Sequence, residues 1–311
     1  LQNLTIGQGI LETLIIRKSD NYIYGRSSDI AWFSKPIKNI YSNPRKDIIK
    51  FEVIKRNPTK GKVIILNTLD NCYGHSLLHF LNLQNIIDQK QEFCVIVIIQ
   101  PFLRWLLPKE GIDEVWIAHV SFGMMKEYYE DLNNKIQNEL QRFGIVYLSH
   151  AHLCPKNVAI EKFSKIKPFN FDHPVSKPRV SFVWREDVNR LWVKSYWIYG
   201  ALRKFGIAGI LQSLHYLRVL IFMFFLHKKL KGKYQLTLVG LGKMGWFPDF
   251  VADERVEKFD DQSEIHTTQM YSQSELVIGV HGSSMILPSA HAGMTISIMP
   301  LKRWGNFAED I

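Results

Sequence analysis

Cysteine is scarce in this chain: 311 residues include only Cys72, Cys94 and Cys154. They lie far apart and no Cys-x-x-Cys pair is present, which excludes a disulfide framework and a zinc ribbon. Such sparse cysteine is typical of a reducing compartment, and we expect a cytoplasmic protein. Because the first residue is leucine, we expect the chain to be a fragment, and a missing start would hide a signal peptide.

Several functional motifs are also missing. The sequence has no Gly-x-Ser-x-Gly and no P-loop, which argues against serine hydrolysis and triphosphate binding of those types. The net charge of +10 suits phosphate-bearing partners, but no basic and aromatic block indicates a nucleic-acid module. The most apolar run, 214–226, is too short for a bilayer span. We predict a buried core helix there, with peripheral membrane contact as the alternative because the lysines of 228–233 follow it.

Strands and helices alternate in two successive halves. In the first, apolar runs predict strands at 63–67, 93–99, 114–118 and 145–149, and helices at 75–87, 102–107 and 122–142. In the second, we predict strands at 179–184, 234–239, 255–259, 276–280 and 295–299, and helical segments at 193–231, 268–274 and 285–292. The pattern predicts an α/β protein of two Rossmann-like domains facing each other. The domains are 1–154 and 179–311, joined by a proline-rich linker at 155–178.

One turn in the second half has the features of an anion site. His281, Gly282, Ser283 and Ser284 follow a buried strand and precede the helix that we expect Gly293 to end. Backbone N–H groups and the dipole of a helix N-terminus favour an anion, and a diphosphate fits such a turn. The two serines can cap the helix and bind phosphate. His281 has either a ligand-binding or a structural role.

A second glycine-rich turn suggests an alternative enzyme class. Gly240-Leu-Gly-Lys-Met-Gly245 fits the G-x-G-x-x-G fingerprint, and Asp260 lies about 20 residues on, as in an NAD(P)-dependent dehydrogenase. Trp246, Phe247 and Pro248 are unsuited to the helix that must follow. Few residues remain after Asp260 to complete a dinucleotide domain. We therefore favour a turn that places Gly240 near a nucleotide without wrapping a dinucleotide.

Three segments resemble the family-61 glycosyltransferases. They are Asn71-Cys-Tyr-Gly-His-Ser-Leu-Leu-His79, Val180-Ser-Phe-Val-Trp-Arg185 with Arg190 and Trp192, and the stretch from Thr268 to Ser284 that contains Val-Ile-Gly-Val-His-Gly-Ser-Ser. Ser283 stands where that family commonly has alanine. The resemblance implies a GT-B architecture with a nucleotide-sugar donor in the cleft between two domains. It also implies an inverting, metal-independent transfer to an acceptor hydroxyl, in polysaccharide or glycoconjugate synthesis.

Glycosyl transfer requires a base for the acceptor and positive charge for the departing diphosphate. Arg185 follows a strand, where open α/β sheets bind ligands, and we expect it to bind phosphate, with Arg190 as a weaker candidate. An ion pair with Glu186 or Asp187 is the structural alternative for Arg185. Asp70 is the first candidate for the base and His75 the second. We expect no metal site and no cofactor besides the nucleotide-sugar. A non-catalytic GT-B-like binding protein is the non-enzyme alternative.

Overall fold

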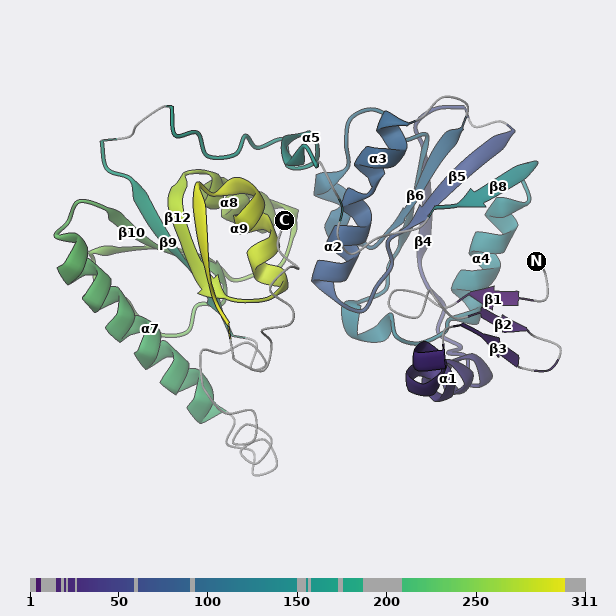
Figure 1. Ribbon diagram of the computed structural model, residues 1–311, viewed down its shortest axis with the longest axis horizontal. Helices are drawn as coiled ribbons and strands as arrows, with labels where there is room; N and C mark the ends of the chain where they lie inside the picture. Colours follow the sequence, from purple (N-terminus) through teal and green to yellow (C-terminus); the bar gives the residue numbers. More distant parts are fainter. Residues whose placement is uncertain are drawn as a thin grey trace. The chain divides into compact units, whose positions relative to one another are not determined.

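The computed structural model describes residues 4–6, 15–17, 20, 22–25, 27–58, 61–89, 93–149, 155, 158–172, 176–186 and 209–299. The chain forms two compact units, Leu1–Val158 and Ala159–Ile311. Each unit contains one five-stranded, mostly parallel sheet with helices packed on it, so the predicted α/β class is confirmed (Figure 1). The predicted linker, 155–178, contains the short helix α5 (Ile160–Ser164).

The main sheet of the first unit has the order β4-β7-β6-β5-β8. Its strands are β4 (Phe51–Lys55), β5 (Lys62–Asn67), β6 (Cys94–Ile99), β7 (Glu114–Ala118) and β8 (Ile145–Leu148). The four predicted strands are confirmed and pair in parallel, whereas β4 is antiparallel to β7 and was not predicted. Because β6 and β8 lie on opposite sides of β5, the strand order reverses at β5.

Helices and turns complete this unit. Its helices are α1 (Ser27–Ser42), α2 (Tyr73–Leu81), α3 (Leu83–Asp88) and α4 (Glu130–Leu140), with 3₁₀ turns at Pro101–Leu106 and Phe122–Met124. A small antiparallel sheet precedes them, formed by β1 (Leu4–Ile6), β2 (Ile15–Arg17) and β3 (Tyr22–Tyr24). The central strands are buried because they consist of runs such as Cys-Val-Ile-Val-Ile-Ile in β6.

The long helix predicted at 122–142 is wrong. A 3₁₀ turn ends at Met124, and α4 begins only at Glu130. Between them the chain pairs with a distant segment: the Arg45 amide donates to the Tyr128 carbonyl at 2.7 Å, and Arg45 bridges Tyr129. Tyr129 therefore has extended backbone (φ −107°, ψ 110°), which interrupts the helix. The apolar period of 122–142 does not reveal this pairing.

The second unit has the order β11-β10-β9-β12-β13, with every neighbouring pair parallel. The strands are β9 (Arg179–Arg185), β10 (Gln235–Leu241), β11 (Val251–Val256), β12 (Ser274–Val280) and β13 (Met294–Ile298). The helices that follow α5 are α7 (Gly209–Leu230), α8 (Asp261–Ser272) and α9 (Ile286–His291). The strand expected at 255–259 thus lies earlier, and the helical turn expected at 268–274 is a full helix whose N-cap is Asp260.

Helices cover both faces of this sheet (Figure 1). Alternate residues of β9, including Phe182 and Trp184, pack with Val219 and Met223 of α7. On the other face α8 and α9 contact each other and the sheet. Gly293 does not end a helix in the left-handed conformation; an added Cβ would lie 2.8 Å from the Glu275 carbonyl, so glycine is needed there for close packing.

Candidate donor-phosphate site and acid–base pair

The strand order of the second unit reverses between β9 and β12. The chain runs outward from β9 to β10 and β11, then crosses to β12 on the other side of β9. In open α/β sheets such a switch point leaves a crevice at the carboxyl ends of the strands, where ligands bind. Arg185 is the last residue of β9, and His281 directly follows β12. The tertiary structure therefore brings together two segments that are almost 100 residues apart in the sequence.

Arg185 and Ser284 are in direct contact at this switch point. The Arg185 Nη1 donates a hydrogen bond of 2.8 Å to the Ser284 Oγ. Both residues are partly exposed, whereas most of β9 and β12 is buried. The sequence predicted that Ser284 caps the following helix, and this is wrong. Its hydroxyl accepts from Arg185, and neither the 3₁₀ turn at Ser283–Met285 nor α9 has a side-chain cap.

The turn after β12 is rigidly built. Gly282 has a φ of 141°, which only glycine adopts without strain, and its carbonyl accepts from the Met285 amide at 2.7 Å. Met285 is buried over Gly279, where an added Cβ would lie 2.4 Å from the methionine sulfur. The His281 amide donates to Ile298, and the His281 ring is 1% exposed, which favours its structural role. These contacts fix the backbone that carries Ser283 and Ser284, and the bond from Arg185 holds the Ser284 hydroxyl.

The expected helix N-terminus is weaker than the sequence indicated. A 3₁₀ turn at Ser283–Met285 precedes α9, which has only six residues. A helix this short sums few peptide dipoles, so its electrostatic contribution is small. The guanidinium of Arg185, rather than the helix, is therefore the main positive charge that the described residues offer an anion here.

Gly240 is needed for strand packing. It pairs with Trp184 in the sheet at a φ of 124°, and an added Cβ would lie 2.3 Å from the Trp184 carbonyl oxygen. All of residues 242–250, which follow β10, are described, and they form a loop without a helix before β11. The G-x-G-x-x-G fingerprint binds pyrophosphate through the helix that it opens. The glycine-rich turn here therefore lacks the context that a dinucleotide site requires.

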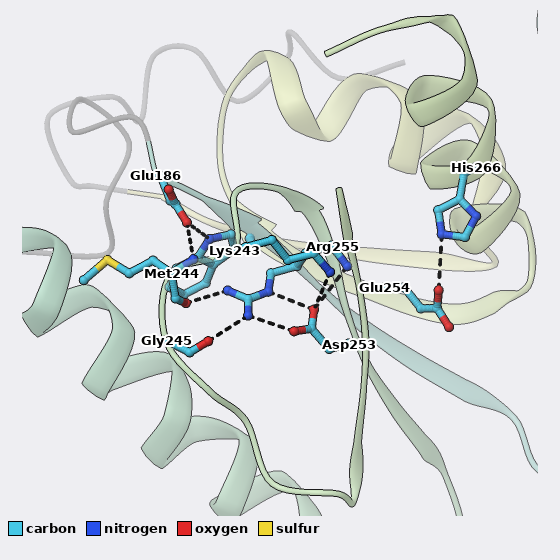
Figure 2. Close-up of polar contacts among 9 residues, drawn as sticks. Glu186, Lys243, Met244, Gly245, Asp253, Glu254, Arg255 and His266 are labelled. Atoms are coloured by element: carbon cyan, nitrogen blue, oxygen red, sulfur yellow. Dashed lines mark hydrogen bonds and ion pairs between the residues drawn. The ribbon is translucent and has the colours of Figure 1, made fainter. Parts of the chain in front are cut away.

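Two charged side chains, Glu186 and the buried Arg255, fasten the loop that follows Gly240 (Figure 2). The Glu186 Oε1 accepts from the Met244 amide at 2.7 Å and from the Trp184 ring N–H at 3.0 Å. The Arg255 side chain, 3% exposed, donates to the carbonyls of Met244 and Gly245. Glu186, which follows β9, thus holds the loop after β10, and this weakens the alternative that it serves mainly as an ion-pair partner of Arg185.

Arg255 also joins the loop to the neighbouring strand. It forms two hydrogen bonds with the Asp253 carboxylate, at 2.9 and 2.8 Å, and this contact lowers the pKa of Asp253. Its guanidinium lies 5.1 Å from the Trp184 ring centroid and 5.0 Å from that of Phe247. Such cation–π contacts strengthen in a desolvated site. Arg255 is therefore a structural residue of the sheet edge.

Trp246 is the residue on this loop that the sequence did not single out as functional. Its side chain is 69% exposed. Its backbone is held nevertheless, because the Tyr216 hydroxyl donates to the Trp246 carbonyl at 2.6 Å. Gly245, next to it, has a φ of 75° and packs against the Tyr216 ring. An exposed tryptophan on a fixed loop offers a flat apolar surface to a ligand. The sequence alone does not distinguish Trp246 from its neighbour Phe247, which is buried in the structure.

Asp70 and His75 lie together at the switch point of the first unit. Asp70 follows β5, and its Oδ1 accepts from the Cys72 amide at 2.8 Å and lies 3.4 Å from the His75 Nδ1. The Asp70 side chain is 5% exposed and that of His75 32%. Gln100, after β6, supports the turn by accepting from the Ser76 hydroxyl at 2.9 Å. The sequence ranked Asp70 first, but the structure makes His75 the more accessible member of the pair.

Two remaining predictions concern Arg190 and metals. Arg190 lies outside the described residues. His79 is buried, and its ring centroid is 6.5 Å from that of His75. Within the part of the chain that the structure describes, no group of three or more His, Cys, Asp or Glu side chains is placed to hold a metal ion.

Comparisons of the chain with protein-family models, curated proteins and solved structures found no match. The function of this chain must therefore be inferred from the geometry and chemistry of the two sites themselves.

Proposed function

We propose that the protein is a glycosyltransferase that moves a sugar from a nucleotide-sugar donor to an acceptor hydroxyl. The observation that carries the proposal is the contact of Arg185 with Ser284 at the switch point of a fully parallel sheet. In this proposal the two units face each other as in GT-B enzymes, the second binding the donor and the first the acceptor. The product is a polysaccharide or glycoconjugate, and the reaction inverts the anomeric carbon without a metal ion.

The donor diphosphate binds at Arg185 and the serine turn. A guanidinium presents five N–H donors in a planar fork that matches two phosphate oxygens. The Ser283 and Ser284 hydroxyls, on the turn that Gly282 and Met285 shape, add neutral hydrogen bonds to the same group. As the bond to the sugar breaks, negative charge grows on the diphosphate, and the positive charge of Arg185 stabilises it.

The nucleoside of the donor lies toward the loop after β10. This loop begins beside Arg185, because Leu241 pairs with Arg185 in the sheet. Trp246 supplies an exposed aromatic face, and stacking on such a face is largely independent of the base. The lysine on the same loop, Lys243, lies 3.8 Å from Asp253 and adds positive charge near this edge (Figure 2).

His75 acts as the general base in this proposal, and Asp70 orients it. The His75 Nδ1 faces the buried Asp70 carboxylate, and in this proposal the other ring nitrogen, Nε2, takes the proton of the acceptor hydroxyl. The hydroxyl oxygen attacks the anomeric carbon, and the bond to the diphosphate breaks on the opposite side. Asp70 then stabilises the imidazolium that forms, as a buried carboxylate does beside a catalytic histidine.

A ligand panel tests the donor assignment. We expect UDP- or GDP-type ligands to raise the unfolding temperature, and Arg185→Gln to weaken their binding by about 1–3 kcal/mol, a factor of about 5–150. Arg45→Gln is the matched control, because Arg45 is an exposed arginine of the first unit, away from the serine turn in the sequence. Stabilisation by NAD but by no nucleoside diphosphate would contradict the proposal. Donor binding without transfer or hydrolysis would favour a non-catalytic binding protein.

A further inference from the structure

Helix α7 has an exposed apolar stripe along its whole length. Six large apolar side chains, each between 48% and 59% exposed, form it: Ile210, Leu214, Leu217, Ile221, Phe224 and Phe225. The prediction of a buried core helix was therefore wrong, because only 22% of its most apolar window is buried. Exposed apolar patches of this extent mark interaction surfaces in folded proteins.

The spacing of these residues places them on one side of the helix. Successive members are three or four positions apart except for the neighbours Phe224 and Phe225, so their side chains lie on one face of the helix. The opposite side is buried: Leu211, His215, Val219 and Met223 recur every four positions, and the last two pack in the core over β9. The helix therefore presents one face to its own sheet and the other outward (Figure 1).

Positive charge accompanies the stripe. Residues 209–233 contain no aspartate or glutamate. Arg218 and Lys229 flank the stripe, Lys228 continues it, and Lys231 and Lys233 follow the helix; all five are exposed. Basic side chains beside exposed apolar ones are typical of helices that lie in the interface of an anionic membrane.

We propose that α7 docks the second unit onto an anionic lipid surface, with the stripe from Ile210 to Phe225 entering the headgroup region. The helix is long and apolar enough to cross a membrane by length and composition, with a mean hydropathy of 1.6. Its contact with β9 instead holds it flat, because crossing would strip Val219 and Met223 from the core. The proposal does not depend on the glycosyltransferase activity.

A second copy of the chain fits this surface less well. Apolar residues every three and four positions also suit pairing of two α7 helices. In a parallel pair, however, the lysines at 228–233 of the two copies would lie side by side and repel each other. In an antiparallel pair they would meet a helix start that carries no acidic residue. Anionic lipid supplies the missing opposite charge.

Sedimentation with lipid vesicles tests the proposal. We expect the full chain to bind phosphatidylcholine vesicles that contain about one third phosphatidylglycerol, to bind pure phosphatidylcholine much less, and to dissociate as salt rises. Ile221→Ser with Phe224→Ser should weaken binding roughly tenfold or more, since both side chains belong to the stripe and are more than half-exposed. Ile48→Ser is the matched control, being an exposed isoleucine of the first unit.

Charge variants and one measurement on the wild type complete the test. Lys228→Glu with Lys229→Glu should abolish the preference for phosphatidylglycerol, whereas Lys109→Glu with Lys126→Glu, at exposed positions in the first unit, should retain most of it. Vesicles should slow amide hydrogen exchange in α7 of the unmodified protein, which needs no variant to fold. Two results would overturn the proposal. One is equal vesicle binding by Ile221→Ser/Phe224→Ser, and the other is a wild-type dimer that this variant dissociates.

Discussion

Protonation of His215 should destabilise the second unit in mild acid. His215 belongs to the buried side of α7, is 1% exposed, and its ring centroid lies 4.9 Å from that of Trp184. Burial, and secondly the charge of Arg218, lowers its pKa to about 4, although Glu186 acts in the opposite direction. The folded protein thus holds this imidazole neutral at a pH where the unfolded chain would bind a proton.

The sign and size of the effect follow from linkage. Because the folded pKa is depressed, the contribution of His215 is fully present above its unfolded pKa of about 6.5 and is lost as the pH falls toward 4. The full difference corresponds to about 3 kcal/mol, of which about 2 kcal/mol is lost between pH 7 and pH 5. This is a large fraction of the stability of a typical domain.

Urea unfolding at a series of pH values measures this loss. His215→Leu removes the titrating group while keeping a side chain of similar volume. Between pH 7 and pH 5 the free energy of unfolding should therefore fall less in this variant than in the wild type, by a margin of about 2 kcal/mol. His266→Leu is the control, because it retains His215 and alters a half-exposed histidine paired with Glu254. Parallel pH dependences of the wild type and His215→Leu would refute the reasoning.

Three further predictions address the candidate sites. Gly282→Ala should lower the free energy of unfolding by about 1–3 kcal/mol in urea titrations, because of its positive φ, whereas Gly123→Ala, with nothing within 4 Å of the added Cβ, should not. His75→Gln should cut turnover by about a hundredfold or more in a transfer assay and leave donor affinity unchanged; full activity would exclude it as the base. Trp246→Ala should leave stability within about 0.5 kcal/mol and weaken nucleotide binding by about 1 kcal/mol or more in titration calorimetry; unchanged affinity would remove it from the site.

Strands were predicted well where burial on both faces leaves continuous apolar runs. The run at β7 was placed at 114–118, as observed, and β5, β6 and β12 were found within two residues at each end. Strand β4 was missed because it is an edge strand with a mixed sequence, Phe-Glu-Val-Ile-Lys. Strand β11, Val-Ala-Asp-Glu-Arg-Val, was misplaced for the same reason, since its charges include Arg255, whose burial depends on aromatic rings elsewhere in the chain.

For the sites, sequence position predicted which residues lie at strand ends but not how they interact. Arg185 and Ser284 were both expected near an anion, and they lie 2.8 Å apart. The role of Ser284 as a helix cap was wrong because the arginine takes its hydroxyl. Likewise, Asp70 and His75 were competing candidates in the sequence, whereas the fold buries the carboxylate and leaves the imidazole accessible.

Local sequence determined the alternation of strands and helices, the turns that need glycine and the positions of chemical groups at strand ends, because these depend on neighbouring residues. Burial and partnership were decided only by the tertiary structure. The run at 214–226 predicts a core helix, but β9 and β10 cover only one side of α7 and leave the stripe from Ile210 to Phe225 exposed. Whether an apolar or charged side chain is buried depends on which distant segments pack against it, and no local pattern encodes that.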